Sequence, residues 1–445
     1  MMRKRYLALS LLLGTIVPVL LLGAAGSASA DGEDHGSNGG AVRFLRSVPV
    51  PGSAFNPSGK MFVFDISWVD QATQLYYLAD RSNAVIDVVD TKTDTFVKQI
   101  AGGFKGFTGN NDTSGPNGVV VIGRPGHQFL IVTDAPSRVV SINLQTDTVV
   151  NEVSTGGAPG LRADELAYDP VDNLLLPVNN ADDKPFATLI KVNPNTGKLT
   201  QPANVEGVDR ITFTDATNGA EQPVWDPGTG MFYISIPEIN GPGGKGDTGA
   251  VKRINPHTAK VEKTFEVKHC QPAGLALGPH GDLLAGCSVI FNTAGTVWLG
   301  LNDPNTAAPI QVILDAKTGA HQTIVAGVGG SDEVWFNPGD GRYYTASRAN
   351  PGAVPNGSNP TTNPVLGVID AESRTLVQLV PTFNTPNPTQ PPPRGTAHSV
   401  AVNAHNNHAF VPLPANNVFP GCLTGCIAVF GTPRNGDDEE GNHDR

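Results

Sequence analysis

A short turn signature, Asp or Asn followed three residues later by Thr or Ser, occurs six times along this chain of 445 residues. In such a turn, the side-chain oxygen of Asp or Asn accepts a hydrogen bond from a backbone N–H two residues further on. The copies follow one another at intervals of 50 to 62 residues: Asp90/Thr93, Asn143/Thr146, Asn193/Thr196, Asn255/Thr258, Asp315/Thr318 and Asp370/Ser373. A repeat of this length predicts an array of similar structural units.

Each signature lies between two β-rich runs, such as the apolar run 84–89 and the alternating run 95–100 around the first copy. Helical periodicity is weak, and strands bounded by tight turns are expected. A second series of hairpins gives the same repeat, at Val69, Ile122, Tyr168, Trp225, Leu277, Phe336 and Val402. The two series together predict an all-β propeller with four-stranded antiparallel blades.

The number of blades follows from a mismatch between these series, because there are seven hairpins but six downstream turns. The last unit stops at residues 431–433 without its outer strand, and the strand-like segment 41–50 could supply one. Such pairing would leave only short, protected strand edges. We expect seven blades with the ring closed by this N-terminal strand, and six blades with a distorted seventh unit is the alternative.

Composition supports a single domain over residues 41–433. The chain contains 51 Gly and 37 Pro, and only 16% of its residues are charged, as is typical of a turn-dense globular β protein. The Pro-rich stretch 381–393 has repeat units on both sides, so we interpret it as a connection between blades.

The N-terminus has the three parts of a Sec-type signal peptide. Cationic residues 3–5 precede an apolar run at 7–22 and small residues at 28–30. We expect a signal peptide at 1–30, cleaved after Ala30, followed by a flexible polar segment at 31–40. This predicts a secreted protein without stable membrane insertion after cleavage; an uncleaved anchor is the alternative.

The formal net charge of −11 becomes more negative when the cationic signal peptide is removed. Binding to nucleic acid through bulk charge is therefore disfavoured. Residues 434–445 contain an acidic run and are expected to be a disordered tail. A monomer is expected.

Four cysteines in an exported chain favour disulfides. Of the three pairings, Cys270–Cys287 would join the two strands of a hairpin, and Cys422–Cys426 would close a small loop. A soft-metal site is disfavoured because the additional Cys and His spacing of zinc sites is missing.

The loops expected on one face of the ring are long. The second-to-third strand connections lengthen in the last four blades, and two links between blades add to the same face: 240–249, 292–309, 349–364, 413–425, 104–116 and 382–396. Loops on a rigid scaffold commonly carry recognition. We therefore expect a small-molecule or glycan site on this long-loop face.

Polar residues recur where six of the seven innermost strands begin, at Asp65, Asn117, Asp164, Glu221, Asp332 and His398, and Ala273 stands at the seventh entrance. Inner strands converge on the ring axis, so crowded carboxylates there would bind a hard cation such as Ca²⁺ or raise one another's pKa. The predicted metal ligands are Asn117, Glu221, Asp164, Asp65 and Asp332, and the predicted catalytic residues are Asp332 and His398. The alternative is that all of these are solvated strand-entrance residues.

Two local motifs resemble the gluconolactonase and regucalcin family: Glu221-Gln222-Pro223-Val224-Trp225-Asp226 and Pro116-Asn117-Gly118-Val119. The resemblance implies that Glu221 and Asn117 bind a divalent cation. Ala273 stands where that family's pattern favours the Asp that acts in lactone hydrolysis. Over residues 62–430 the repeat more closely resembles the YVTN-type propellers, which include many secreted or surface proteins without known catalysis.

Three functions are compatible with these features. The first is a secreted propeller with a divalent-cation site at the channel mouth, which binds or hydrolyses a small extracellular metabolite such as a lactone. If it is an enzyme, this would be a metal-dependent hydrolase of lactonase type. The second is a noncatalytic extracellular propeller that binds protein or glycan, and the third is a polysaccharide lyase.

Overall fold

The computed structural model describes residues 40–241, 244–298, 307–350, 364–382 and 397–433. The expected signal peptide, the segment 31–39, the acidic tail and most of the Pro-rich stretch lie outside these residues. Within the described residues, no helix is long and apolar enough to cross a bilayer.

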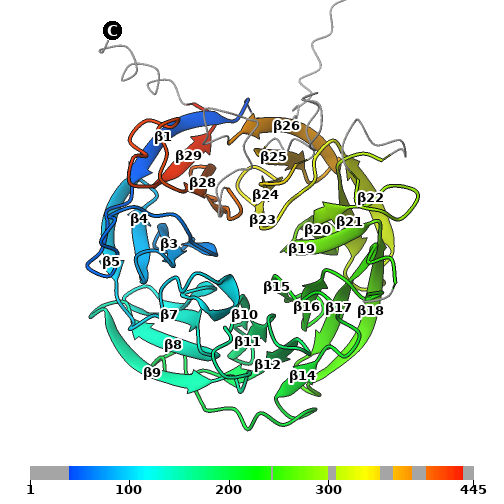
Figure 1. Cartoon of the computed structure of the whole chain (residues 1–445), viewed down its shortest axis with the longest axis horizontal. Helices are drawn as coiled ribbons and strands as arrows, with labels where there is room; N and C mark the ends of the chain where they lie inside the picture. Colours follow the sequence, from blue (N-terminus) through cyan, green and yellow to red (C-terminus); the bar gives the residue numbers. More distant parts are fainter. Residues whose placement is uncertain (1–39, 242–243, 299–306, 351–363, 383–396, 434–445) are drawn as a thin grey trace, which may run out of the picture. The chain divides into compact units, whose positions relative to one another are not determined.

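The strands form a ring of six hydrogen-bonded sheets, with the first strand of each antiparallel run nearest the centre (Figure 1). The first sheet contains β2 (Ser67–Asp70), β3 (Leu75–Asp80), β4 (Val85–Asp90) and β5 (Thr95–Ile100). The second contains β6 (Val119–Arg124), β7 (His127–Asp134), β8 (Arg138–Asn143) and β9 (Thr148–Ser154). The third contains β10 (Leu166–Asp169), β11 (Leu174–Asn179), β12 (Phe186–Thr188), β13 (Ile190–Lys191) and β14 (Arg210–Thr212).

The fourth sheet is the largest, with β15 (Pro223–Asp226), β16 (Met231–Ile236), β17 (Thr248–Asn255), β18 (Lys260–Lys268), β19 (Cys270–Leu277), β20 (Asp282–Ile290), β21 (Ile310–Asp315) and β22 (His321–Ala326). The fifth contains β23 (Val334–Asn337), β24 (Arg342–Ser347), β25 (Val365–Asp370) and β26 (Thr375–Pro381). The sixth contains β27 (Ala401–Asn403), β28 (His408–Leu413), β29 (Cys426–Gly431) and β1 (Arg43–Pro49). Two short 3₁₀ turns, Asn111–Thr113 and Pro279–Gly281, complete the described elements.

The arrangement of sheets differs from the expected set of separate four-stranded blades. Five of the six sheets have the size of one blade, and the other has eight strands, so neither seven nor six separate four-stranded sheets are present. The cause is a single parallel residue pair, Thr248 with Cys270, which joins β17 to β19 and merges two antiparallel groups into one sheet. The coarser prediction, an all-β propeller with four-stranded antiparallel blades, is confirmed.

The N-terminal strand β1 pairs antiparallel with β29, from Arg43 opposite Gly431 to Pro49 opposite Cys426. The predicted pairing of segment 41–50 with the last unit is therefore confirmed. Val42 and Val48 beside this strand are buried in two neighbouring hydrophobic clusters. The strand consequently contributes both hydrogen bonds and apolar packing.

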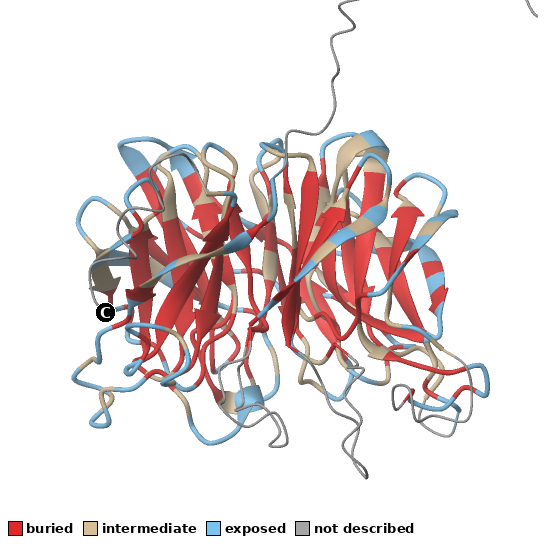
Figure 2. Cartoon of the chain, turned by 90° about the horizontal axis from the view of Figure 1, so that it is seen from above, coloured by how far each residue is buried: buried red, intermediate tan, exposed pale blue. Residues whose placement is uncertain are grey.

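The core lies between neighbouring sheets (Figure 2). The second strands are buried along most of their length, as in β3 and β16, because their apolar residues contact a sheet on either side. The outer strands alternate between exposed and covered residues, as in β5 and β26. Burial therefore decreases from the second strand of each blade to the outer strand at the rim. The inner strands face the centre of the ring.

The repeated turn has the predicted chemistry. The Asp90 Oδ1 accepts a hydrogen bond from the Lys92 N–H at 2.8 Å, and the Asn143 Oδ1 accepts one from the Gln145 N–H at the same distance. Both turns join a third to a fourth strand, so they lie at the opposite end of the sheets from the starts of the inner strands. The long second-to-third strand connections lie at the inner-strand starts, although residues 299–306 and 351–363 within them are outside the described set.

Both predicted disulfides are present. Cys270–Cys287 joins β19 to β20, and Cys422–Cys426 closes the loop before β29. They are consistent with an extracellular location, since such bonds persist in oxidising compartments.

Candidate functional site

The predicted strand-entrance residues share one backbone register. In five blades the entrance residue donates its N–H to a carbonyl of the second strand at 2.7 to 3.1 Å: Asp65 to Ala79, Asn117 to Thr133, Asp164 to Val178, Glu221 to Ser235 and Asp332 to Ala346. These bonds extend the inner hairpins past the ends of the strands. The side chains therefore start from equivalent positions around the ring.

Direct backbone bonds also link neighbouring inner strands at this level. The Ile66 N–H donates to the Asn117 carbonyl at 3.3 Å, and the Gly118 N–H donates to the Asp164 carbonyl at 3.2 Å. A Cβ on Gly118 would come within 2.8 Å of that same carbonyl oxygen, so a glycine is required for the approach. Close inner strands bring the entrance side chains together at the channel mouth.

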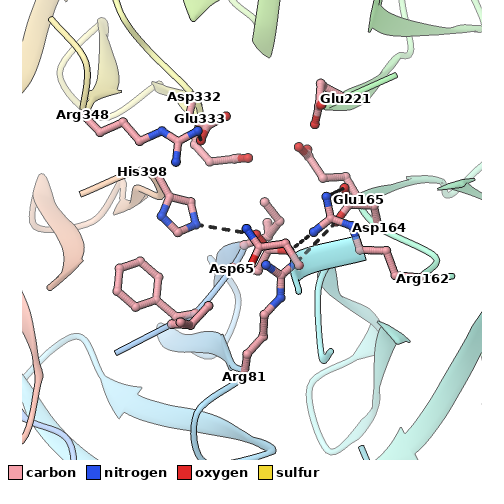
Figure 3. A pocket seen from close by; sticks show the side chains of 14 residues that line it. Asp65, Arg81, Arg162, Asp164, Glu165, Glu221, Asp332, Glu333, Arg348 and His398 are labelled. Atoms are coloured by element: carbon pink, nitrogen blue, oxygen red, sulfur yellow. Dashed lines mark hydrogen bonds and ion pairs between the residues drawn. The ribbon is translucent and has the colours of Figure 1, made fainter. Parts of the chain in front are cut away.

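These side chains enclose a cavity of about 330 Å³ (Figure 3). It is lined by Val63, Phe64, Asp65, Ile66, Arg81, Asn111, Arg162, Asp164, Glu165, Glu221, Asp332, Glu333, Arg348 and His398. Five of the six predicted site residues therefore line one cavity. The sixth, Asn117, is fully buried beside it.

Arg81 is the centre of the charged network on one side of the cavity. Its side chain is only 2% exposed. Its Nε donates to the Asn117 Oδ1 at 2.9 Å, and its Nη2 donates to the Asp65 carboxylate. The same nitrogen lies 3.7 Å from the Asp164 Oδ1. One buried guanidinium thus joins three of the predicted site residues.

Arg162 is the second buried cation. Its Nη2 lies 2.7 Å from the Asp164 Oδ2, and its Nη1 lies 3.8 Å from the Asp65 Oδ2. Its Nε donates to the Asn180 Oδ1 at 3.2 Å. The two guanidiniums therefore compensate Asp65 and Asp164 together.

The two aspartates respond differently to this setting. Burial acts to raise the pKa of Asp65, but Arg81, the hydrogen bond with His398 and Arg162 together hold that pKa well below its usual range. Burial raises the pKa of Asp164 to about 7, because the pull of Arg162 is countered by the neighbouring Asp65 charge. Asp65 is therefore ionised at neutral pH, whereas Asp164 is close to its titration midpoint.

Three glutamates also line the cavity. Burial, followed by the charges of Asp164 and Asp332, raises the pKa of Glu221 to about 8. Burial and neighbouring carboxylates raise the pKa values of Glu165 and Glu333 well above the usual range. At neutral pH these carboxyl groups favour their protonated form.

The two predicted catalytic residues lie on adjacent sheets at the cavity wall. The His398 ring stacks on Phe64 with 4.8 Å between ring centroids, and its Nε2 lies 3.6 Å from the Asp65 Oδ1. The Asp332 Oδ2 lies 2.8 Å from the Arg348 Nη2. The stacking and the ion pair fix both side chains at the opening.

The arrangement does not fit the expected divalent-cation site. The Asn117 oxygen is occupied by Arg81, and the Asp65 and Asp164 carboxylates are paired with guanidiniums. Among the residues that the structure describes, no group of three or more His, Cys, Asp or Glu side chains could hold a metal ion. Calcium binding stays a prediction without a supporting ligand geometry.

Sequence reasoning missed the arginines of the cavity. Arg81 and Arg348 directly follow β3 and β24, which are second strands of their sheets, and Arg162 precedes Asp164 by two residues. Second strands end at the face where inner strands begin. The positions of the three arginines at strand ends of this face therefore contain the signal for their place in the cavity.

Comparisons with known proteins support the fold and leave the family open. No protein-family model and no curated protein matches this chain. Among solved structures, 1564 chains match, so the fold is common. One is hydrazine synthase of Kuenenia stuttgartiensis, with a TM-score of 0.54 and 12% identity over 82% of this chain and 96% of that chain. Together with the ring of sheets this likeness supports a β-propeller, and neither the YVTN type nor the gluconolactonase family is confirmed.

Proposed function

We propose that this chain binds a small polar metabolite in the cavity at the channel mouth. The observation that carries the proposal is the convergence of six carboxyl groups and three guanidiniums on one cavity of about 330 Å³. That volume is at the lower end of the range for ligand pockets, roughly 300–1,000 Å³. A ligand of metabolite size with several polar groups suits this lining better than an apolar molecule or a protein loop.

Hydrolysis of such a metabolite, for example a lactone, is the second candidate. Asp65 is held ionised by Arg81, whereas Glu221, Glu165 and Glu333 favour the protonated form. Carboxyl groups with pKa values driven apart in one site can act as general base and general acid. In this proposal Asp164, whose pKa is about 7, takes a proton from water as the water oxygen attacks the carbonyl carbon, and a protonated glutamate donates a proton to the ring oxygen as the carbon–oxygen bond of the lactone breaks.

The proposal also concerns how the six hydrogen-bonded sheets are divided into blades. The eight-stranded sheet counts as two blades because its halves, β15–β18 and β19–β22, are joined by one parallel pair. The β1–β29 pairing then closes the ring between the first and last units. We propose an extracellular location, with the two disulfides in support.

The test is a binding and turnover screen of small polar metabolites, including sugars, lactones and amines, on the protein and on matched variants. Asp65→Asn and Glu333→Gln change the cavity, whereas Glu266→Gln changes an exposed residue on the outer strand β18. We expect at least one compound to bind, and its affinity to fall at least tenfold in both cavity variants but not in the control. Binding that is unchanged in the cavity variants would reject the proposal.

A further experiment tests whether the cavity binds calcium. Without an assembled ligand set, we expect chelation and calcium readdition to leave the melting temperature unchanged. A calcium-dependent rise that disappears in Glu221→Gln would instead restore the divalent-cation hypothesis.

A further inference from the structure

The cavity contains carboxyl groups that form no ion pair with its arginines. Arg81 and Arg162 are engaged with Asp65 and Asp164, and Arg348 is paired with Asp332. None of the ion pairs among the described residues includes Glu165, Glu221 or Glu333. Three carboxyl groups therefore face the cavity without a cationic partner (Figure 3).

Two of these glutamates are deeply buried. Glu165 is 6% exposed and Glu333 is 3% exposed, yet both line the cavity. They directly precede the inner strands β10 and β23 of the third and fifth sheets, and their side chains interact with each other. Within the described residues, neither carboxyl accepts a hydrogen bond from a backbone N–H or a basic side chain. A buried carboxyl without such donors is costly in the empty cavity.

Asp164 provides an independent observation. Its Oδ1 is buried and has no hydrogen-bond partner within the described residues, and it lies 3.7 Å from the Arg81 Nη2. Asp164 belongs to the same cavity wall as Glu165. The unsatisfied group is again an acceptor, which indicates that the ligand supplies donors.

We propose that the metabolite bound in this cavity carries a primary ammonium group, held among the carboxyl groups of Glu165, Glu221 and Glu333. This inference rests on the proposed function and specifies its ligand class. A primary ammonium provides three N–H donors and no acceptor, which matches a wall rich in carboxyl oxygens. Its positive charge would also lower the raised pKa values of these carboxyl groups, so that they bind the ligand as carboxylates.

Other ligand classes match this wall less well. An anion would face six carboxyl groups and would have to displace aspartates from Arg81 and Arg162. A neutral polyol can donate hydrogen bonds but has no charge with which to form an ion pair with a carboxylate. The acidic chain, with a formal charge of −11, also favours the approach of cations.

The experiment compares three probes of nearly equal size and different charge: ethanolamine, ethylene glycol and glycolate. Isothermal titration calorimetry at constant ionic strength measures the affinity of the full-length protein for each probe. We expect ethanolamine to bind at least tenfold more tightly than either other probe. We expect Glu333→Gln, which preserves shape and removes the charge, to weaken ethanolamine binding at least tenfold, with no change in Glu266→Gln.

Glu221→Gln is the second variant, because Glu221 is only partly buried and its replacement is tolerated more easily if Glu333→Gln unfolds. Three results would overturn the inference. Ethylene glycol could bind as tightly as ethanolamine, or ethanolamine could fail to bind at 50 mM, which is roughly the upper limit for a specific amine site. Ethanolamine binding could also be unaffected by both glutamine variants. If ethanolamine fails while neutral metabolites bind and respond to Asp65→Asn, only the ammonium inference is wrong. If no compound responds to any cavity variant, the proposed function fails as well.

Discussion

At the scale of single residues, Arg81 has the largest expected effect on the cavity. Its buried guanidinium contacts Asn117, Asp65 and Asp164. Replacement by Leu would leave two buried aspartates with less compensation, and breaking a buried pair in this way typically costs about 3–5 kcal/mol. We expect Arg81→Leu to lower the free energy of unfolding by that amount in urea denaturation.

Arg348→Gln is the matched control for Arg81→Leu. Arg348 also pairs with a cavity aspartate, Asp332, but its side chain is 47% exposed. Exposed pairs contribute at most about 1 kcal/mol. Similar losses in the two variants would show that burial does not determine the role of Arg81.

A second residue-scale prediction concerns the repeated turn. The residue four places after each signature Asp or Asn has a positive φ: Asp94, Asp147, Gly197, Ala259, Gly319 and Arg374. At Gly319, a Cβ would also come within 2.0 Å of the Phe265 Cδ1. We expect Gly319→Ala to destabilise the protein by about 1–3 kcal/mol, from left-handed strain and overpacking.

Ala259→Gly tests the same backbone position in the opposite direction. Ala259 has φ +50°, so glycine would relieve left-handed strain but lose conformational entropy on folding. These effects nearly cancel, and thermal denaturation should show a change within about 1 kcal/mol. A large loss in Ala259→Gly would contradict the strain argument.

At the scale of elements, the β3–β4 hairpin contains a buried acid pair. Asp80 and Asp87 are both fully buried, and the Asp87 Oδ2 has no hydrogen-bond partner within the described residues. Burial raises the pKa of Asp80 to about 6, and burial with the Asp80 charge raises the pKa of Asp87 well above its usual range. The folded state therefore binds protons more tightly than the unfolded state.

The sign of the pH dependence follows from these raised pKa values. The stabilising contribution is present below the unfolded pKa, about 4, and is lost as pH rises through about 6. Asp87→Asn removes one charge, and its oxygen can still accept the bond from the Gln99 Nε2. We expect the variant to be more stable than the parent by about 1–3 kcal/mol at pH 8 and by less at pH 5.

Urea unfolding at both pH values measures this difference, with the half-exposed Asp172→Asn as control. Asp172 lies in the turn after β10, outside the buried pair. If the free energies of unfolding of the parent and of Asp87→Asn change in parallel with pH, the acid pair does not titrate between pH 5 and pH 8.

At the scale of the whole molecule, the sequence predicted the turns and strands that repeat along the chain. It did not predict contacts between segments that lie far apart in the sequence. The turn at Asp90 and the strands around it follow from side-chain chemistry within a few residues. The Thr248–Cys270 pair is a single contact between two groups of strands and has no signature in the sequence. The contact of Arg81 with Asp164 likewise depends on how closely Gly118 lets neighbouring inner strands approach.

The last prediction concerns β1, which joins the two ends of the described chain. Without it, β29 would present an unpaired edge, and the apolar contacts of Val42 and Val48 would be lost. Burying two such side chains contributes about 3–6 kcal/mol. We expect a chain beginning at residue 51 to unfold at lower urea concentration than one beginning at residue 40, and to self-associate in size-exclusion chromatography.

A synthetic peptide of residues 41–50 separates loss of pairing from general damage. If β1 acts by covering β29, the peptide should raise the melting temperature of the shortened chain and reduce its self-association. A peptide in which Ser47 is replaced by Pro should be much weaker, because Ser47 lies opposite Ala428 in the ladder and proline removes its N–H. Equal rescue by both peptides would mean that apolar packing, rather than strand pairing, holds the first and last units together.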